Sequence, residues 1–255
     1  VDEIEQLTSD PDNLAGLILR VNSPGGSAFA SEQIWEALER FKKETELPFY
    51  VSMGDVAASG GYYISCGADK IFAQPTTITG SIGIFGLIPE FKELINDRLG
   101  MNTTTVKTNA NGNFPSPFNP MTDVQRQKMQ AYIERGYDTF TRRCAEGRHV
   151  SQDSIKVIAE GRVWDGATAM TIGLVDSLGS LHSTILAMAS DLGLDRYTVA
   201  TYPKASEKWW ENLLEMDELM ATTGLDSETL SMLRKANELK KAPRVQCRME
   251  DVIIK

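Results

Sequence analysis

Short apolar runs alternate with helix-length amphipathic segments from residue 16 to residue 148. Four of these runs are typical of strands: residues 16–21, 48–53, 70–74 and 103–108. After the first run, Ile34, Leu38 and Phe41 recur at the spacing of one helix face. Parallel strands need crossover connections of helix length, so this alternation predicts an α/β fold with a mostly parallel sheet.

The second half of the chain has mainly helical periodicity. We expect a helix over residues 90–99 that ends at Gly100, a long helix that follows Thr122 and runs to about residue 146, and a helix capped by residues 151–154. Three more are expected over residues 183–192, 207–220 and 227–241. The chain is divided into a domain over residues 1–195 and a helical extension over residues 196–255. Residues 244–254 alternate weakly, as in a strand suited to pairing with the edge strand of a partner.

Composition excludes several classes of function. The 255 residues carry a net charge of −9, which argues against binding of a nucleic-acid backbone. Two histidines, with Cys66, Cys144 and Cys247 at unrelated spacings, give no zinc pattern, so we expect no metal or cofactor and assign the cysteines no role. No apolar run approaches the ~18 residues of a membrane span. The start at Val1 suggests a piece of a longer polypeptide.

The first segment that can carry chemistry is Asn22 to Ser27, between the first strand and its helix. Gly25 and Gly26 let the backbone approach a ligand and point its N–H groups outward together. This geometry favours a negative oxygen, either a phosphate or a developing oxyanion. The segment lacks both nucleotide-binding glycine patterns, so nucleotides are disfavoured. A tight turn without function is the alternative.

The second segment runs from Gly54 to Tyr63 and places Ser59 among small residues. Its neighbours are alanines on one side and Gly60 and Gly61 on the other, which clears space around the hydroxyl. A small-residue helix that packs closely on the sheet is the alternative. The two segments follow successive strands, and the carboxyl ends of parallel strands share one edge of the sheet, so the segments can converge.

A nucleophilic serine needs a base, and the histidines are poor candidates for it. His149 and His182 flank helix starts, where surface or capping roles are more common, so a Ser–His–Asp triad is not favoured. A desolvated lysine is the known alternative base. Lys107 is the best placed lysine in the chain, although a lysine at a strand end is usually solvated.

Five motifs resemble one known family. Residues 19–27, 52–62, 79–85, 161–166 and 173–179 are similar to segments of the signal peptide peptidase A family, also called protease IV, in the same order. The resemblance runs from about Leu14 to Leu194. It implies a Clp protease/crotonase-like fold, a spiral of βαβ units, and a serine peptidase with a Ser/Lys dyad.

The resemblance also implies roles for individual residues. Ser59 would be the nucleophile, the N–H groups of Gly26 and Gly60 would form the oxyanion hole, and Ser81 would orient the ammonium of the base lysine. Ser59 would attack a peptide carbonyl, form an acyl-enzyme and release it to water. The implied substrates are residual signal peptides, bound extended through main-chain hydrogen bonds.

One departure from the family pattern concerns the base. Single-unit members carry the base lysine in the segment that aligns with residues 106–117, where Gly112 takes its place. In tandem members the C-terminal unit holds the serine and the N-terminal unit holds the lysine, and this chain resembles that C-terminal unit. We therefore expect the N-terminal half of the same polypeptide to supply the base, and the isolated chain to be soluble and nearly inactive. The full-length form would be a tetramer at the cell inner membrane, with its catalytic domain outside the cytoplasm.

Two other functions remain open at this point. A crotonase-like acyl-CoA enzyme would use the same oxyanion hole to stabilise an enolate without a serine nucleophile. A non-catalytic scaffold would use the helices after Thr201, with Trp209 and Trp210, for assembly. Labelling by a fluorophosphonate, which reacts with activated serines, separates the peptidase from the acyl-CoA enzyme. Mutation of Ser59 in the complete protein separates an enzyme from a scaffold.

Overall fold

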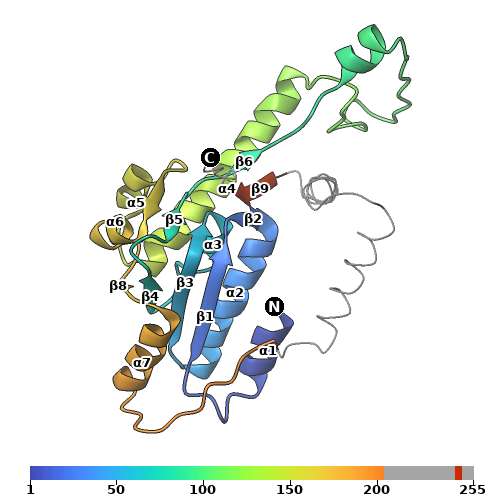
Figure 1. Ribbon diagram of the computed structural model, residues 1–255. Coiled ribbons are helices and arrows are strands. Elements are labelled where there is room, and N and C mark those ends of the chain that lie inside the picture. The colour runs from blue at the N-terminus through green and yellow to red at the C-terminus, as the bar shows by residue number, and fades with distance from the viewer. Residues whose placement is uncertain (204–244, 249–255) are drawn as a thin grey trace, which may run out of the picture.

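The structure is a computed structural model that describes residues 1–203 and 245–248 (Figure 1). In these residues a six-stranded sheet is built around the long strand β3 (Phe49–Ala58). β1 (Leu17–Ser23) runs parallel along one edge of β3. The other edge is shared by two parallel strands, β4 (Lys70–Ala73) beside the first half of β3 and β5 (Ile78–Gly80) beside the second half.

Two short strands complete this sheet. β8 (Ser177–Leu178) runs parallel to β4, and β7 (Val163–Asp165) runs antiparallel to β5. The sheet is therefore mostly parallel, and the predicted α/β architecture is confirmed. It agrees with the Clp protease/crotonase-like class that the resemblance implies.

The helices cover the sheet and extend from it. They are α1 (Asp2–Ser9), α2 (Ala28–Thr45), α3 (Gly60–Tyr63), α4 (Asp123–Gly147), α5 (Gln152–Ile158), α6 (Gly166–Thr171) and α7 (Leu181–Asp191). Three predictions are confirmed: α4 is the long helix after Thr122, α5 is the helix capped by residues 151–154, and α7 is the helix over residues 183–192. Thr122 caps α4 in a reciprocal capping box with Gln125.

Alternation along β3 places side chains in two apolar clusters. Val51 and Met53 belong to the main cluster, together with residues of α2, α3 and α4. Tyr50 lies on the opposite face, where it packs with Phe72 of β4 and Met188 of α7. Both faces of β3 are thus covered, as its near-continuous apolar sequence predicts.

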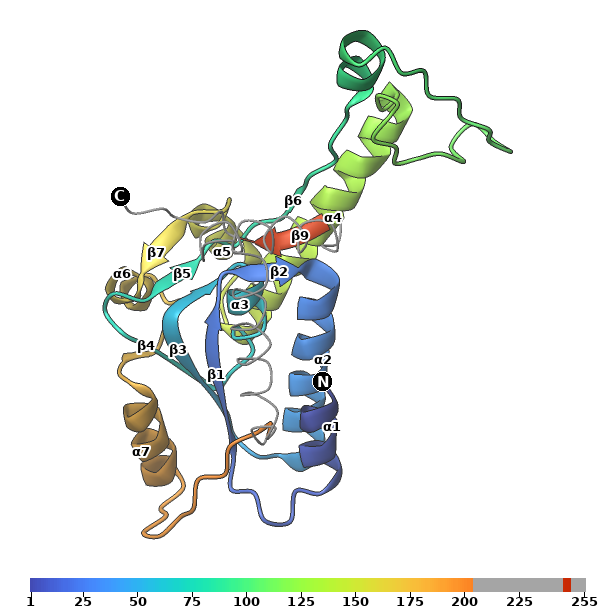
Figure 2. The same cartoon turned by 45° about the vertical axis from the view of Figure 1, so that its right-hand side comes forward.

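A second, three-stranded sheet lies at the carboxyl ends of β1 and β3, next to α3 (Figures 1 and 2). In it β9 (Val245–Arg248) lies between β2 (Gly25–Ser27) and β6 (Phe85–Gly86) and is antiparallel to both. The Asn22–Ser27 segment is thus partly a strand. Within the tail predicted over residues 244–254, the described residues Val245–Arg248 pair inside their own chain, because β2 and β6 offer them two edges.

Residues 87–122 and the first half of α4 form an arm that projects from the sheet (Figure 2). The predicted strand over residues 103–108 is wrong. These residues are exposed and no strand of the described residues pairs with them, and a β-branched sequence needs such a neighbour to form a strand. The helix predicted over residues 90–99 is centred on one π-helical stretch, η1 (Leu94–Arg98), and Gly100 follows with φ 66°.

Other expectations fall outside the described ranges. The helices predicted over residues 207–220 and 227–241, with Trp209 and Trp210, lie there, so the boundary near residue 195 stays a prediction. Within residues 1–203 and 245–248 no helix is both long and apolar enough to cross a bilayer.

Candidate active site

Ser59 lies where β3 ends and α3 begins, in a backbone conformation that few residues adopt. Its φ is 53° and its ψ is −116°. The Ser59 N–H donates to the carbonyl of Gly80 at 2.9 Å, and its own carbonyl accepts from the N–H of Tyr63 at 2.8 Å. Strain of this kind costs about 1–3 kcal/mol and persists only where its surroundings impose it. Such a strand-to-helix turn is typical of nucleophilic serines.

The diglycine bend lies directly against this turn, as the sequence predicted. A methyl group built on Gly60 would lie 3.3 Å from the Gly26 nitrogen and 2.6 Å from the Ser31 Oγ. On Gly61 a methyl group would lie 2.6 Å from the carbonyl oxygen of Ser23. Only glycine permits both approaches, so Gly60 and Gly61 hold the N-terminal end of α3 beside the main chain of Gly26.

The Ser59 hydroxyl itself is buried, with 1% of the residue exposed. Its oxygen has no hydrogen-bond partner among the described residues. The sequence predicted open space around the hydroxyl, and this detail is wrong: the small neighbours serve close packing of Ser23, Ser31 and the diglycine on α3. A buried hydroxyl without a partner in the protein is unusual and requires an explanation.

The register of β3 and β5 brings the positions of Ser81 and Ser59 to the same end of the sheet. Ala58, the last residue of β3, pairs with Gly80, the last residue of β5, so each serine directly follows its strand. Ser81 also has a positive φ, 47°, and is 6% exposed. Its hydroxyl is 3.5 Å from the carbonyl of Gly161, a long contact that leaves it available to a stronger partner.

The basic candidates do not come together with Ser59. Residues 101–119, which include Lys107 and Gly112, form the outer part of the arm, away from β3 in both views (Figures 1 and 2). Lys107 is exposed, and its Nζ donates to the Ala110 carbonyl at 3.3 Å. His149 and His182 are also exposed, in agreement with their interpretation as surface residues.

Sequence reasoning missed a polar cluster behind the turn. The Glu32 carboxylate accepts hydrogen bonds from the hydroxyl of Tyr63 and from Arg143 NH2, the latter at 2.9 Å. The Arg143 guanidinium lies 3.7 Å above the ring of Trp35. The available signal was Tyr63 at the end of the Ser59 motif, but spacing alone does not show that residues 32 and 143 meet it.

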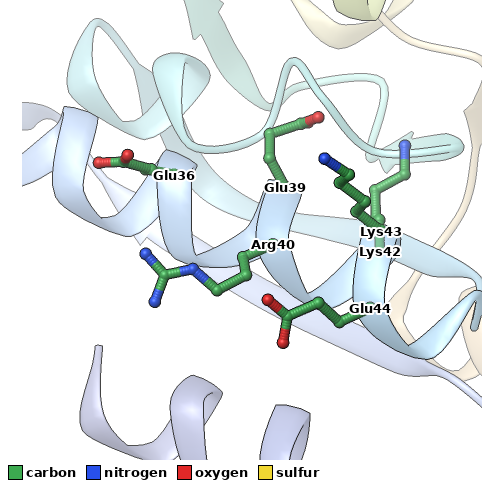
Figure 3. Close-up of a pocket in the computed structure, with 6 residues that line it drawn as sticks. All are labelled: Glu36, Glu39, Arg40, Lys42, Lys43 and Glu44. Atoms are coloured by element: carbon green, nitrogen blue, oxygen red, sulfur yellow. The ribbon is translucent and has the colours of Figure 1, made fainter.

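A surface hollow elsewhere on the molecule is not a candidate site. It is lined by six charged side chains of one helix, α2: Glu36, Glu39, Arg40, Lys42, Lys43 and Glu44 (Figure 3). Two of them are engaged in salt bridges, Arg40 with Glu5 at 3.6 Å and Lys42 with Asp69 at 2.9 Å. This mixture of charges is typical of a solvated helix face. Across the described residues no cluster of three or more His, Cys, Asp or Glu side chains is suited to a metal ion.

Comparison with known proteins gives the family. The model of "Peptidase family S49" matches residues 41–195, so this chain belongs to peptidase family S49. It is similar to "Protease 4" of Haemophilus influenzae, with 44% identity over 69% of this chain and 28% of that protein. It is also similar to "Putative signal peptide peptidase SppA" of Enterococcus faecium, with 34% identity over 82% of this chain and 61% of that protein.

The family match confirms the serine-type peptidase class expected from the sequence. The chain spans less than two thirds of the length of the curated relatives that it matches here. Among solved structures it is similar to the ClpP1 N165D mutant from Listeria monocytogenes, with a TM-score of 0.45 and 15% identity, over 71% of this chain and 85% of that chain.

Proposed function

We propose that this chain is the serine-bearing unit of a Ser/Lys endopeptidase that degrades residual signal peptides. The observation that carries the proposal is the contact of the Ser59 turn with the diglycine, in which a methyl group on Gly60 would lie 3.3 Å from the Gly26 nitrogen. A nucleophile and oxyanion-hole donors must lie this close to share one carbonyl group.

In the proposed mechanism Ser59 Oγ attacks the scissile carbonyl carbon while a lysine takes its proton. The N–H groups of Gly26 and Gly60 stabilise the oxyanion of the tetrahedral intermediate. The amine leaves with a proton from the lysine, and water then releases the acyl group from Ser59. Ser81 holds the lysine ammonium, a role suited to its place at the same end of the sheet as Ser59 and to its weakly engaged hydroxyl.

The substrate binds as an extended strand between β2 and β6. β9 supports this proposal, because it pairs antiparallel with both strands, and Cys247 lies opposite Gly26 of the proposed oxyanion hole. Two facing strand edges offer main-chain hydrogen bonds to a peptide of any sequence. A protease of signal peptide remnants needs such tolerance of sequence.

The base comes from outside this chain, from the N-terminal half of the same polypeptide. Two observations support this: the Ser59 hydroxyl has no partner among the described residues, and Lys107 is exposed and donates to the carbonyl of Ala110. An assembly that brings a second unit to Ser59, a tetramer anchored at the inner membrane with its catalytic units outside the cytoplasm, completes the site.

The first test replaces Ser59 by alanine in the full-length protease. Ser59→Ala removes the nucleophile and lowers kcat on a signal-peptide substrate by at least about 10³-fold, with folding unchanged by circular dichroism. Fluorophosphonate labels wild type at Ser59 and does not label Ser59→Ala. Unchanged turnover of Ser59→Ala would refute the assignment, and a wild type that is neither labelled nor able to hydrolyse the signal peptide would favour the crotonase-like alternative.

The source of the base is tested with Lys107. The isolated chain is expected to hydrolyse casein or the signal peptide no faster than Ser59→Ala does, and Lys107→Ala leaves the full-length enzyme unchanged. Activity of the isolated chain that disappears in Lys107→Ala would instead make Lys107 the base.

A further inference from the structure

Glu32 connects three helices behind the Ser59 turn. It lies in the first turns of α2, and its carboxylate accepts hydrogen bonds from Tyr63 of α3 and from Arg143 of α4. Tyr63 is 5% exposed, and its ring lies 4.7 Å from that of Phe140. Arg143 is fixed over Trp35 at 3.7 Å. The carboxylate is therefore held by one neutral and one charged donor.

The protonation states make this a stable arrangement. Burial and the hydrogen bond to Glu32 raise the pKa of Tyr63 above its ordinary value, so the phenol remains a donor. Burial disfavours the charged form of Arg143, but the hydrogen bond and the charge of Glu32 outweigh it and raise the pKa of Arg143. The two donors keep their protons throughout the neutral range.

The cluster is linked to the nucleophile through α3. The Tyr63 N–H donates to the Ser59 carbonyl at 2.8 Å, so both residues belong to one helical turn. α3 has only four residues, and a helix so short is not stable by its own hydrogen bonds. Its position therefore depends on contacts such as the one from the Tyr63 hydroxyl to Glu32.

The cluster is linked to the diglycine through α2. Ser31, next to Glu32, donates from its hydroxyl to the Ser27 carbonyl at 3.0 Å. The same hydroxyl faces Gly60, where a methyl group would lie 2.6 Å from it. The Glu32–Tyr63 hydrogen bond thus joins the segment that carries the nucleophile to the segment that carries Gly26.

We infer that Glu32 is a positioning residue of the peptidase reaction, which sets the spacing between Ser59 and the oxyanion hole by holding Tyr63 against α2 and α4. The inference rests on the proposed function. It also places Arg143, on the helix that carries the arm, in contact with the group that holds the nucleophile turn.

The test removes the hydroxyl alone. Tyr63→Phe keeps the ring on Phe140 and is expected to lower kcat about tenfold with KM unchanged, because a misplacement of the reacting groups by a fraction of an ångström is costly. A substrate-derived peptide aldehyde, which forms a tetrahedral adduct with a serine, should bind about tenfold more weakly, whereas the cleaved peptide product should bind as before. Glu32→Ala should reproduce these effects, and the double variant should add nothing to them.

The chain offers a matched control at the other end of β3. The hydroxyl of Tyr50 donates to Asp191 at 2.5 Å, so Tyr50→Phe also removes a tyrosine–carboxylate hydrogen bond, far from Ser59 along the strand. Tyr50→Phe should lower the melting temperature but leave kcat and aldehyde binding at wild-type values.

Each outcome decides the inference. Wild-type kcat in Tyr63→Phe, additive losses in the double variant, or an equal loss in Tyr50→Phe would overturn it. If Glu32→Ala does not fold, Tyr63→Phe and its control decide alone. The proposed function is judged separately by Ser59→Ala: if that variant is inactive while Tyr63→Phe is normal, only the positioning role fails.

Discussion

At the scale of single residues, the backbone conformation of Ser59 costs the fold stability. Its φ of 53° and ψ of −116° lie in a region that glycine enters far more easily than serine. The hydrogen bonds of its backbone to Gly80 and Tyr63 impose this conformation. A serine kept here therefore serves something other than the stability of the fold.

This strain predicts that two inactivating substitutions of Ser59 differ in their stability. Ser59→Ala keeps the Cβ atom and therefore the strain, whereas Ser59→Gly releases the strain. Glycine also raises the entropy of the unfolded chain, which opposes this gain. Ser59→Gly should therefore be more stable than Ser59→Ala by about 1 kcal/mol. Melting temperatures of both variants and of wild type measure the difference. A Ser59→Gly variant less stable than Ser59→Ala would show that the turn is unstrained.

At the scale of elements, the proposed function predicts that β9 and a peptide substrate compete for the edges of β2 and β6. A tail that pairs with these edges for about 50–90% of the time raises KM about two- to tenfold. The full-length protease shortened to end at residue 243 should therefore have a KM lower by this factor, with kcat unchanged. Steady-state kinetics on a signal-peptide substrate give both constants.

A substitution in β9 separates the effect of its strand pairing from the effect of shortening the chain. Cys247→Pro removes one main-chain N–H from β9 and should act in the direction of the truncation, whereas Cys247→Ser keeps the backbone and should resemble wild type. If the shortened enzyme has a higher KM or loses activity, β9 is part of the groove wall and does not compete with the substrate.

The elements differ in how far the sequence could predict them. The capped helix α4 carries its own periodicity and was predicted closely, whereas the strand predicted over residues 48–53 continues to Ala58 as β3, through small residues that carry no apolar pattern. Residues 103–108 have a strand-like composition but no neighbouring strand, and the pairing of β9 with β2 depends on two segments more than 200 residues apart. The meeting of Glu32 with Arg143 is likewise a property of the packed fold and not of spacing.

At the scale of the whole molecule, the arm differs from the rest of the surface in the apolar side chains that it exposes. The arm exposes large apolar side chains, among them Leu99 at 61%, Met101 at 60% and Val106 at 94%. Exposed apolar groups gathered on one projection are typical of surfaces that contact other protein.

An ion pair between β4 and α7 makes a contribution to stability that depends on pH. Lys70 lies 2.6 Å from Asp191 of α7, and hydrogen bonds from Lys70 and then Tyr50 lower the pKa of Asp191 below its ordinary 3.8. A carboxyl with a lowered pKa contributes stability above its ordinary value, and this contribution disappears as the pH falls through the pKa of the folded state. Asp191→Asn should therefore have a lower melting temperature than wild type at pH 7, and this difference in melting temperature should become smaller below pH 3.8. Asp195→Asn removes the same charge beyond α7 and controls for the change in net charge. A difference in melting temperature between Asp191→Asn and wild type that stays constant across this pH range would contradict the ion pair.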